Sequence, residues 1–557
     1  MALNGQINRP EFGLFDPDYQ GKRFYQLFFS TCSLIVLIFY FSYTYALLIA
    51  LVKFRGLALL RNGFLALNEL ALGYYSILLL YNVARGYQQI KAPLTPKITK
   101  DQIGTENVPF VSILVPMYKE PANVVKYTLL AALDMNYPKN RYEVVVAEDG
   151  PSDDSVKRVC EELGVKYVSR VKRDGFKAGA VNNVLPKLLG EYVLFIDADH
   201  ILEKNVIYNC LLAWRENTIA VQSRIDFVNT PNLLTSVSAY LQIQFFNLYQ
   251  RARRSTGSAI FAGGSALFDT KKLIDSGGFN PLTIADDTDT SFILRAQGHR
   301  IEYIDTIGGW ALIPWDPVHM IRQIWRWMTG ITKSFTARTK MIFTSDTPLI
   351  VKIDHFSVAI FPTVSMTLWF SLYIRIYALL TSESILIVPP MFGIAILGII
   401  PFYIPFVAIY AGIHAVITDI KAISFKQKNL KDQLTAVAGF YILMFAGQPF
   451  LIGAIFKGLT RINVAFNRTP KEKKSNDVGL TKIMRQYFIY SVFLAILGFF
   501  GCLGLYLNFP IDLGILTLMA LSITMLIPLI ISFLWYWRLE GYLEEVEGIS
   551  AINYIGS

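Results

Sequence analysis

The sequence predicts a mixed, mostly parallel α/β domain with helices on both sheet faces, joined to an all-α transmembrane domain of about six spans plus interfacial helices. Three observations predict it. Short runs rich in Val and Ile alternate with helix-like segments through 105–345. Apolar runs of about 20 residues, the length that crosses a bilayer, flank that region on both sides. Only 17% of the 557 residues are charged and 53% are hydrophobic, as is typical of membrane proteins.

Alternating strands and helices define the α/β domain. The predicted strands are 110–118, 142–150, 165–171 and 192–199, and the predicted helices between them are 121–133, 153–163 and 177–189. This alternation is typical of a parallel sheet that is covered on both faces. Ligands of such folds bind beyond the carboxyl ends of the strands, so functional side chains are expected there.

Long apolar runs predict the membrane-spanning helices. Spans are expected at 25–52, 64–84, 356–380, 386–412, 487–507 and 511–537. The run 434–456 lies between two basic segments and is interpreted as interfacial or re-entrant. Those basic segments and both chain ends are assigned to the cytosolic side, because cytoplasmic loops are rich in Lys and Arg. Lys53, Arg55 and Arg61 fall in a loop that this topology puts outside, so the topology of the first hairpin stays open.

The predicted division of the chain has eight parts. They are a cytosolic N-terminal segment (1–24), a transmembrane hairpin (25–90), a linker (91–104), a cytosolic α/β domain with interfacial helices (105–345), a second hairpin (346–412), an interfacial or re-entrant segment (413–486), a third hairpin (487–537) and a cytosolic tail (538–557). We therefore expect a multi-pass, integral protein of the cell membrane.

The charge pattern favours a membrane over nucleic acid as a partner. The net charge is +10, and the basic clusters 421–431 and 468–475 adjoin apolar stretches, as is typical of the anionic cytoplasmic face of a membrane. No basic folded face with base-reading residues is found, so nucleic acid is not expected. A transporter or channel would carry charged residues inside its spans, whereas the acidic motifs here lie in the α/β domain.

Two predicted strands end in acids. The first ends in Glu148-Asp149-Gly150, and the other in Asp197-Ala198-Asp199. In a strand, residues two apart face the same side, so Asp197 and Asp199 are expected to lie together. Two hard carboxylate ligands suit Mg²⁺ or Mn²⁺, whose other positions water and phosphate oxygens fill. A D-x-D taken alone is common, but at the end of a buried strand it predicts a metal site.

A phosphate group bound there would also need cations. Lys177 lies at an expected helix start, and a helix N-terminus presents free N–H groups to phosphate. A solvated surface lysine is the alternative interpretation.

A third acidic cluster, Asp286, Asp287 and Asp289, precedes the helix-like run 290–298. Such acids either cap a helix or supply a general base that deprotonates a hydroxyl nucleophile.

Further along, Gln323, Arg326 and Trp327 share one face of an expected helix. An arginine there can contact a diphosphate bidentately, and the Trp ring can stack on a sugar or simply pack at a membrane interface.

Taken in order, these motifs resemble the membrane-integrated, processive family 2 glycosyltransferases, the cellulose, hyaluronan and mannan-type synthases. The motifs Glu148-Asp149, Lys177-Ala-Gly, Asp197-x-Asp199, Asp286-Asp287 and Gln323-x-x-Arg326-Trp327 carry the resemblance over about 90–540. The run 261–268 looks like the family's acceptor loop, 221–229 looks like one of its strands, and 466–471 looks like its gating loop. The resemblance implies a GT-A fold.

The resemblance also implies a role for each matching residue. Asp287 would be the catalytic base. The donor would be bound by Glu148, Asp149, Lys177, Asp197, Gln323 and Arg326, and the acceptor by Trp327, Gly264 and Asp286. Asp197 and Asp199 would hold Mg²⁺ or Mn²⁺. Phe466, Thr469 and Lys471 would belong to the gating loop.

The resemblance implies an inverting transfer of sugar from a nucleotide-diphosphate sugar into a β-linked polysaccharide. The donor would be a UDP-sugar or GDP-mannose. The polysaccharide would cross the membrane through the chain's own spans. A growing polysaccharide or a lipid-linked acceptor and membrane lipids are the other expected partners. The family's T-E-D reads Ala285-Asp286-Asp287 here, which leaves Asp289 as a rival base, and Ala262 replaces a cysteine of the acceptor loop. Single transfer to a lipid-phosphate or lipid-linked acceptor is the alternative function.

Overall fold

The computed structural model describes residues 14, 23–52, 54–151, 153–227, 233–314, 317–358 and 451–462. The predicted gating-loop residues Phe466, Thr469 and Lys471 lie outside the described residues, as do the three predicted spans after 380 and nearly all of 356–380.

Within the described residues, an eight-stranded mixed sheet has the order β3-β2-β1-β4-β7-β6-β8-β5. The strands are β1 (Val111–Met117), β2 (Tyr142–Asp149), β3 (Lys166–Arg170), β4 (Tyr192–Phe195), β5 (His200–Leu202), β6 (Thr218–Phe227), β7 (Ala266–Asp269) and β8 (Arg300–Ala311). Strands β1 to β4 pair in parallel, as do β6 and β8, whereas β7 runs antiparallel to β4 and β6 and β5 antiparallel to β8. The predicted mixed, mostly parallel sheet is confirmed.

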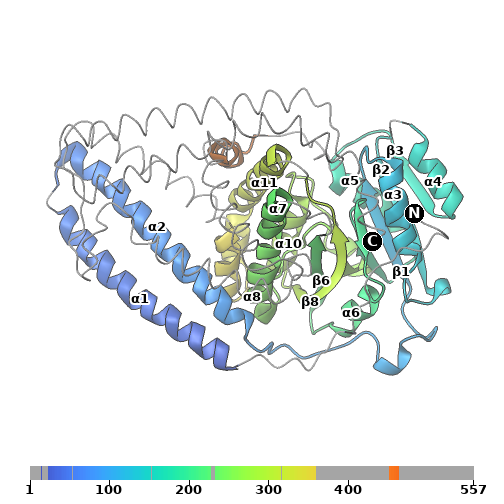
Figure 1. Cartoon of the computed structure of the whole chain (residues 1–557), viewed down its shortest axis with the longest axis horizontal. Helices are drawn as coiled ribbons and strands as arrows, with labels where there is room; N and C mark the ends of the chain where they lie inside the picture. Colours follow the sequence, from blue (N-terminus) through green and yellow to red (C-terminus); the bar gives the residue numbers. More distant parts are fainter. Residues whose placement is uncertain are drawn as a thin grey trace.

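Helices cover both faces of the sheet (Figure 1). They are α3 (Ala122–Leu133), α4 (Ser155–Leu163), α5 (Phe176–Val184), α6 (Val206–Leu212), α7 (Leu233–Gln244), α8 (Arg251–Arg253), α9 (Thr270–Asp275), α10 (Asp286–Ala296) and α11 (Pro317–Thr344), with a π-helical segment at Phe245–Gln250 and 3₁₀ turns at Lys100–Gln102, Lys139–Arg141, Leu185–Lys187 and Arg254–Thr256. Successive strand residues serve different cores: Val145 packs in one apolar cluster and Val144 and Val146 in the other. This period of two is what a sheet covered on both faces requires.

Strand β4 is shorter than predicted. The sequence predicts a strand over 192–199, but β4 ends at Phe195, and Asp197 and Asp199 lie in the turn that leads to β5. The prediction that strand pleating makes these two carboxylates face one way is therefore wrong. A tight turn after the strand brings them together instead.

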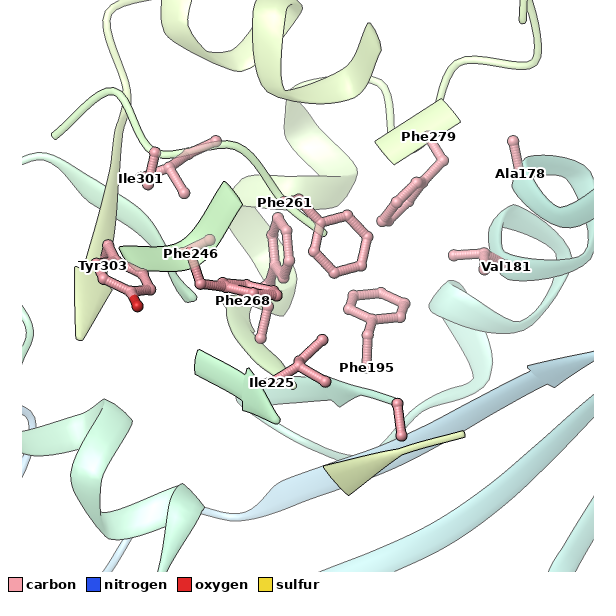
Figure 2. Packing of buried hydrophobic residues seen from close by; sticks show 14 of the residues in the cluster. Ala178, Val181, Phe195, Ile225, Phe246, Phe261, Phe268, Phe279, Ile301 and Tyr303 are labelled. Carbon is pink, nitrogen blue, oxygen red and sulfur yellow. The ribbon is translucent and has the colours of Figure 1, made fainter. Parts of the chain in front are cut away.

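An aromatic cluster fixes the chain on both sides of that turn. Phe195, Phe261, Phe268 and Phe279 gather in one core, with ring centroids 5.1 to 6.1 Å apart (Figure 2). Phe195 is the last residue of β4, and Phe261 precedes the loop that contains Gly263 and Gly264. Buried aromatic rings dominate core energetics, so this cluster sets where the aspartate turn and the glycine loop meet.

Two long helices, α1 (Arg23–Leu51) and α2 (Gly56–Gly86), form an antiparallel hairpin beside the α/β domain (Figure 1). The end of α2 is joined to the domain by Arg85, which donates to Thr256 Oγ1 at 3.1 Å and also pairs with Asp354, which follows α11. Among the described residues, none of the helices combines the length and apolar character needed for a bilayer crossing. The predicted spans therefore stay predictions.

Candidate active site

A cavity of about 390 Å³ lies at the carboxyl ends of β1, β2 and β4. The turn after β4, the glycine loop, the start of α10 and one face of α11 complete its walls. Of the predicted site residues, the cavity brings together Asp149, Lys177, Asp197, Asp199, Asp286, Asp287, Gln323, Arg326 and Trp327. Glu148 and Gly264 are not among the lining residues.

Gly263 marks the point where the acidic groups converge. A Cβ added to it would lie 3.4 Å from Asp197 Oδ2, 3.5 Å from Asp287 Oδ2 and 3.7 Å from Lys177 Nζ. Its φ of +85° is a conformation that other residues adopt only at a cost. The left-handed backbone therefore favours glycine here, whereas a Cβ would meet the three charged side chains only at ordinary van der Waals distance.

Lys177 is the cation at the centre of this group. It lies in the first turn of α5, which confirms the predicted helix start, and Gly175 in a left-handed conformation precedes the helix. Its Nζ donates to Asp197 Oδ1 at 2.6 Å and to the Gly263 carbonyl at 3.3 Å. Burial alone would lower the pKa of Lys177, but Asp197, Asp286 and Asp287 outweigh burial and raise it. Lys177 is therefore charged and not a solvated surface lysine.

The turn after β4 fits a divalent cation. Ligand atoms of Asp197, Asp199 and His200 lie within 4.8 Å of one another. An octahedral ion with bonds of about 2.1 Å holds opposite ligands about 4.2 Å apart, so small side-chain rotations would bring these atoms into range. The two carboxylates suit Mn²⁺ and Mg²⁺ alike, whereas an imidazole is typical of transition metals and not of Mg²⁺. Sequence reasoning missed His200, although it directly follows the D-x-D.

Asp286 and Asp287 lie inside the first turn of α10, not before the helix as predicted. Burial raises the pKa of Asp286 to about 7, although Lys177 acts in the opposite direction. Burial also raises the pKa of Asp287, again opposed by Lys177 and by a hydrogen bond from the Thr288 N–H to Oδ1. A carboxylate whose pKa is moved towards neutrality in a cavity is suited to accept a proton.

Asp289 does not share this environment. Its side chain is fully buried, outside the residues that line the cavity, and Arg338 of α11 donates to both of its oxygens at 2.9 and 3.1 Å. A carboxylate held by a bidentate arginine is poorly suited to take a proton from a substrate. The two candidate bases that the sequence left open therefore lie in different places. Asp287 faces the cavity, and Asp289 holds α10 against α11.

Helix α11 supplies the opposite wall. Gln323, Arg326 and Trp327 lie on its cavity side, as predicted from their spacing. Gly330, one turn further, lets α11 approach the start of α10, because an added Cβ would lie only 2.5 Å from the Ala285 Cβ. Burial lowers the pKa of Arg326, and Asp287 and Asp197 oppose that effect. Arg326 therefore faces the same carboxylates as Lys177, from the other side.

Glu148 and Asp149 point to opposite sides of β2. The Glu148 carboxylate accepts a hydrogen bond of 2.7 Å from the Tyr167 hydroxyl, and burial raises its pKa. Asp149 lines the cavity, where Arg170 and Arg173 pair with its two oxygens at 2.7 and 3.2 Å. The nucleobase of a donor sugar could bind Asp149 only in competition with these two arginines. Glu148 faces away from the cavity.

The glycine loop is held by a residue that the sequence did not single out. The Gln222 side-chain amide donates to the Gly264 carbonyl and accepts from the Ala262 N–H, both at 2.9 Å. A Cβ added to Gly264 would lie 2.9 Å from His200 Nδ1. Gly264 therefore packs against the aspartate turn rather than lining the cavity. The only sequence signal for Gln222 was its position inside 221–229, which resembles a strand of the family.

Comparison with known proteins places this domain in a family. Residues 112–277 match the family model "Glycosyl transferase family 2". Residues 112–277 therefore carry a family 2 glycosyltransferase domain.

The family 2 domain also resembles specific relatives. It is 29% identical over 277 residues to a cellulose synthase catalytic subunit (UDP-forming) of Pseudomonas fluorescens, covering 48% of this chain and 36% of that protein. It is 30% identical over 250 residues to "Probable glucomannan 4-beta-mannosyltransferase 7" of Oryza sativa, covering 41% of this chain and 42% of that protein. The matches thus span less than half the length of these two relatives.

The fold also resembles that of a solved structure. A mannosyltransferase from Pyrobaculum calidifontis, solved in complex with GDP-Man and Mn2+, matches with a TM-score of 0.50 at 20% identity, over 72% of this chain and all of that chain. This likeness confirms the expected GT-A-like sheet with its helices. It carries no conclusion about substrate.

Proposed function

We propose that this protein is an inverting glycosyltransferase that polymerises sugar from a nucleotide-diphosphate sugar into a β-linked polysaccharide. The observation that carries the proposal is the position of Asp287: its carboxylate faces Asp197 and Lys177 across Gly263, in a cavity that Arg326 and Trp327 close. The similarity to cellulose synthase subunits and a glucomannan mannosyltransferase supports the polymer product.

Each group has a role in this proposal. Asp287 takes the proton of the acceptor hydroxyl, which then attacks the anomeric carbon from the face opposite the departing nucleoside diphosphate. Lys177 and Arg326 bind the diphosphate and stabilise the charge that develops on it. Trp327 offers its ring to the sugar at the acceptor end.

Charge balance supports a bound metal. Four carboxylates, Asp197, Asp199, Asp286 and Asp287, face the cations Lys177 and Arg326, and a diphosphate would add more negative charge. Asp197, Asp199 and His200 would hold Mg²⁺ or Mn²⁺, which supplies Lewis-acid stabilisation of the leaving diphosphate.

A membrane location is part of the same proposal. Helices α1 and α2 carry large apolar side chains that are more than half exposed, among them Phe24, Leu34, Ile38, Phe41, Leu57 and Leu60. Contiguous exposed apolar surface of this kind is typical of protein that contacts lipid or another protein. Export of the polymer through the chain's own spans, with the α/β domain in the cytosol, is proposed on the sequence pattern.

The test is a turnover assay on the full-length protein in detergent. The protein is incubated with Mg²⁺ or Mn²⁺ and a panel of radiolabelled UDP- and GDP-sugars, and the product is sized. A polymer from one donor, absent with Asp287→Asn, is the expected result. A single sugar on a lipid would favour the alternative function, and no transfer from any donor would overturn the proposal.

A further inference from the structure

The backbone of the glycine loop is bound by side chains from four separate elements. These side chains are Gln250 of the π-helical segment, Gln222 of β6, Lys177 of α5 and Ser291 of α10. Residues 260–264 belong to no strand, so these hydrogen bonds satisfy the loop backbone in place of a sheet ladder. The position of the loop therefore depends on the elements that carry the four side chains.

Ser291 lies on the same helix as the proposed base. Its Oγ accepts a hydrogen bond from the Phe261 N–H at 2.9 Å and donates one to the Asp287 carbonyl at 2.7 Å. Asp287 and Ser291 are four residues apart, so they share one face of α10. This buried hydroxyl therefore joins the backbone of the loop to the backbone of Asp287 through a single atom.

The other face of α10 is held separately. Asp289 is paired with Arg338 of α11, and the helix N-cap, Ala285, supplies no side-chain hydrogen bond to the first turn. Ser291 thus holds the Asp287 side of the helix against the glycine loop, while Asp289 holds the helix against α11.

The spacing between the loop and Asp287 bears on the proposed reaction. Phe261 is two residues from Gly263, where an added Cβ would lie 3.5 Å from Asp287 Oδ2. A general base works only within hydrogen-bond reach of the proton it accepts, and a displacement of about 1 Å can lower a rate about 100-fold. A hydrogen bond that sets this spacing is therefore expected to affect turnover as well as stability.

We propose that Ser291 is a positioning residue for sugar transfer: its hydroxyl fixes the distance between the glycine loop and Asp287. The proposal rests on the proposed glycosyltransferase function, and it gives Ser291 an effect on the rate of transfer rather than on binding of the donor. The groups proposed to bind the donor diphosphate, Lys177 and Arg326, lie on other helices, α5 and α11.

Kinetics of the full-length protein in detergent test the proposal, with the UDP- or GDP-sugar that wild type transfers as the donor. Ser291→Ala is expected to lower kcat by about 10- to 100-fold, while the donor KM changes by less than about threefold. Ser291→Thr restores the hydroxyl and should recover most of the lost kcat. Ser291→Cys places a weaker hydrogen-bonding group in the same space, so its kcat should lie between those of Ser291→Ala and wild type.

Thr290→Val is the matched control. Thr290 is the preceding residue of α10 and, like Ser291, is 1% exposed, and its Oγ1 accepts from the Asn280 N–H at 3.3 Å. Thr290→Val therefore removes a buried hydroxyl that accepts from a backbone N–H, as Ser291→Ala does, but this hydroxyl binds outside the glycine loop. Both variants should lower the melting temperature, and only Ser291→Ala should lower kcat.

Hydrogen exchange followed by mass spectrometry tests the connection without turnover. In wild type, Ser291 Oγ protects the Phe261 N–H. Ser291→Ala is expected to speed exchange by about two- to tenfold, both over 260–264 and at the start of α10, because loss of the shared hydroxyl releases both segments. Thr290→Val should leave exchange over 260–264 unchanged.

Three kinetic results would overturn the proposal. They are a kcat for Ser291→Ala equal to that of wild type, an equal fall in kcat with Thr290→Val, and a Ser291→Thr variant no more active than Ser291→Ala. Unchanged exchange over 260–264 in Ser291→Ala would remove the connection itself. Failure of the glycosyltransferase function would look different, because wild type would then transfer no sugar from any donor while Ser291→Ala still changed exchange in both segments.

Discussion

The first turns of α10 carry two aspartates in different environments. Asp287 lines the cavity close to Asp197 and Lys177, and burial raises its pKa. Asp289, two residues further along, is fully buried, does not line the cavity, and accepts hydrogen bonds from Arg338 of α11 on both of its oxygens. The comparison shows that the packing around a carboxylate, and not the residue type, determines whether it is placed to accept a proton.

The largest expected effect tests the aspartate that lines the cavity. Asp287→Asn should lower kcat by about 10²- to 10⁴-fold, because it removes the group that accepts the proton. Steady-state kinetics with the preferred donor sugar measures this, and the melting temperature should stay near that of wild type.

Asp289→Asn is the matched control, two residues along the same helix. It leaves Arg338 without its partner in the interior, so it should destabilise the fold by about 3–5 kcal/mol. If Asp289→Asn abolished turnover with unchanged stability, the assignment of the base would be wrong.

A second prediction concerns the metal. His200→Ala should weaken Mn²⁺ binding by about 10- to 100-fold, whether His200 contacts the ion directly or orients Asp197, which lies 3.7 Å from its Nε2. Electron paramagnetic resonance of free Mn²⁺ during a titration measures the affinity without any turnover. Unchanged affinity would remove His200 from the site.

The approach of α11 to α10 gives a third, smaller effect. Gly330→Ala should destabilise the protein by about 1–3 kcal/mol, because the new Cβ meets Ala285 at the start of α10. Gly453→Ala is the control, since nothing lies within 4 Å of its added Cβ. Chemical denaturation compares the two, and an equal effect from both would contradict the close-packing argument.

The smallest effect is a pH dependence. Asp287 must be ionised to act as a base, and its pKa is raised, so kcat/KM should fall on the acid side with an apparent pKa above the ordinary 3.8 of an aspartate. The pKa of Asp286 is raised to about 7, so its contribution to stability is greatest below 3.8 and is lost as pH rises through about 7. Initial rates and melting temperatures across pH 4 to 9 measure both signs, and an acid limb at an ordinary carboxylate pKa would contradict the buried environment.

Local patterns determined the elements of this fold. Runs rich in β-branched residues located β1, β2 and β3 to within a residue or two, and the spacing of Gln323, Arg326 and Trp327 placed all three on the cavity side of α11. These features follow from helix and strand periodicity, which acts between near neighbours in the chain.

Other features depended on contacts between distant segments. Strand β4 ends at Phe195, where its pairing with β1 and β7 stops and its ring packs against Phe261 and Phe279, and sequence periodicity does not encode these contacts. The residue His200 was passed over because its role depends on a turn and not on a motif.

The sequence alone determined which chemistry this chain carries: carboxylates after strands, a lysine at a helix start and an arginine–tryptophan face. Only the tertiary structure gave Asp287 and Asp289 different environments. Asp287 and Asp289 are alike in sequence, but their surroundings differ. Arg338 of α11 pairs with Asp289, whereas Asp287 lines the cavity. The physical reason is that burial and partner charges are set by packing between elements far apart in the chain.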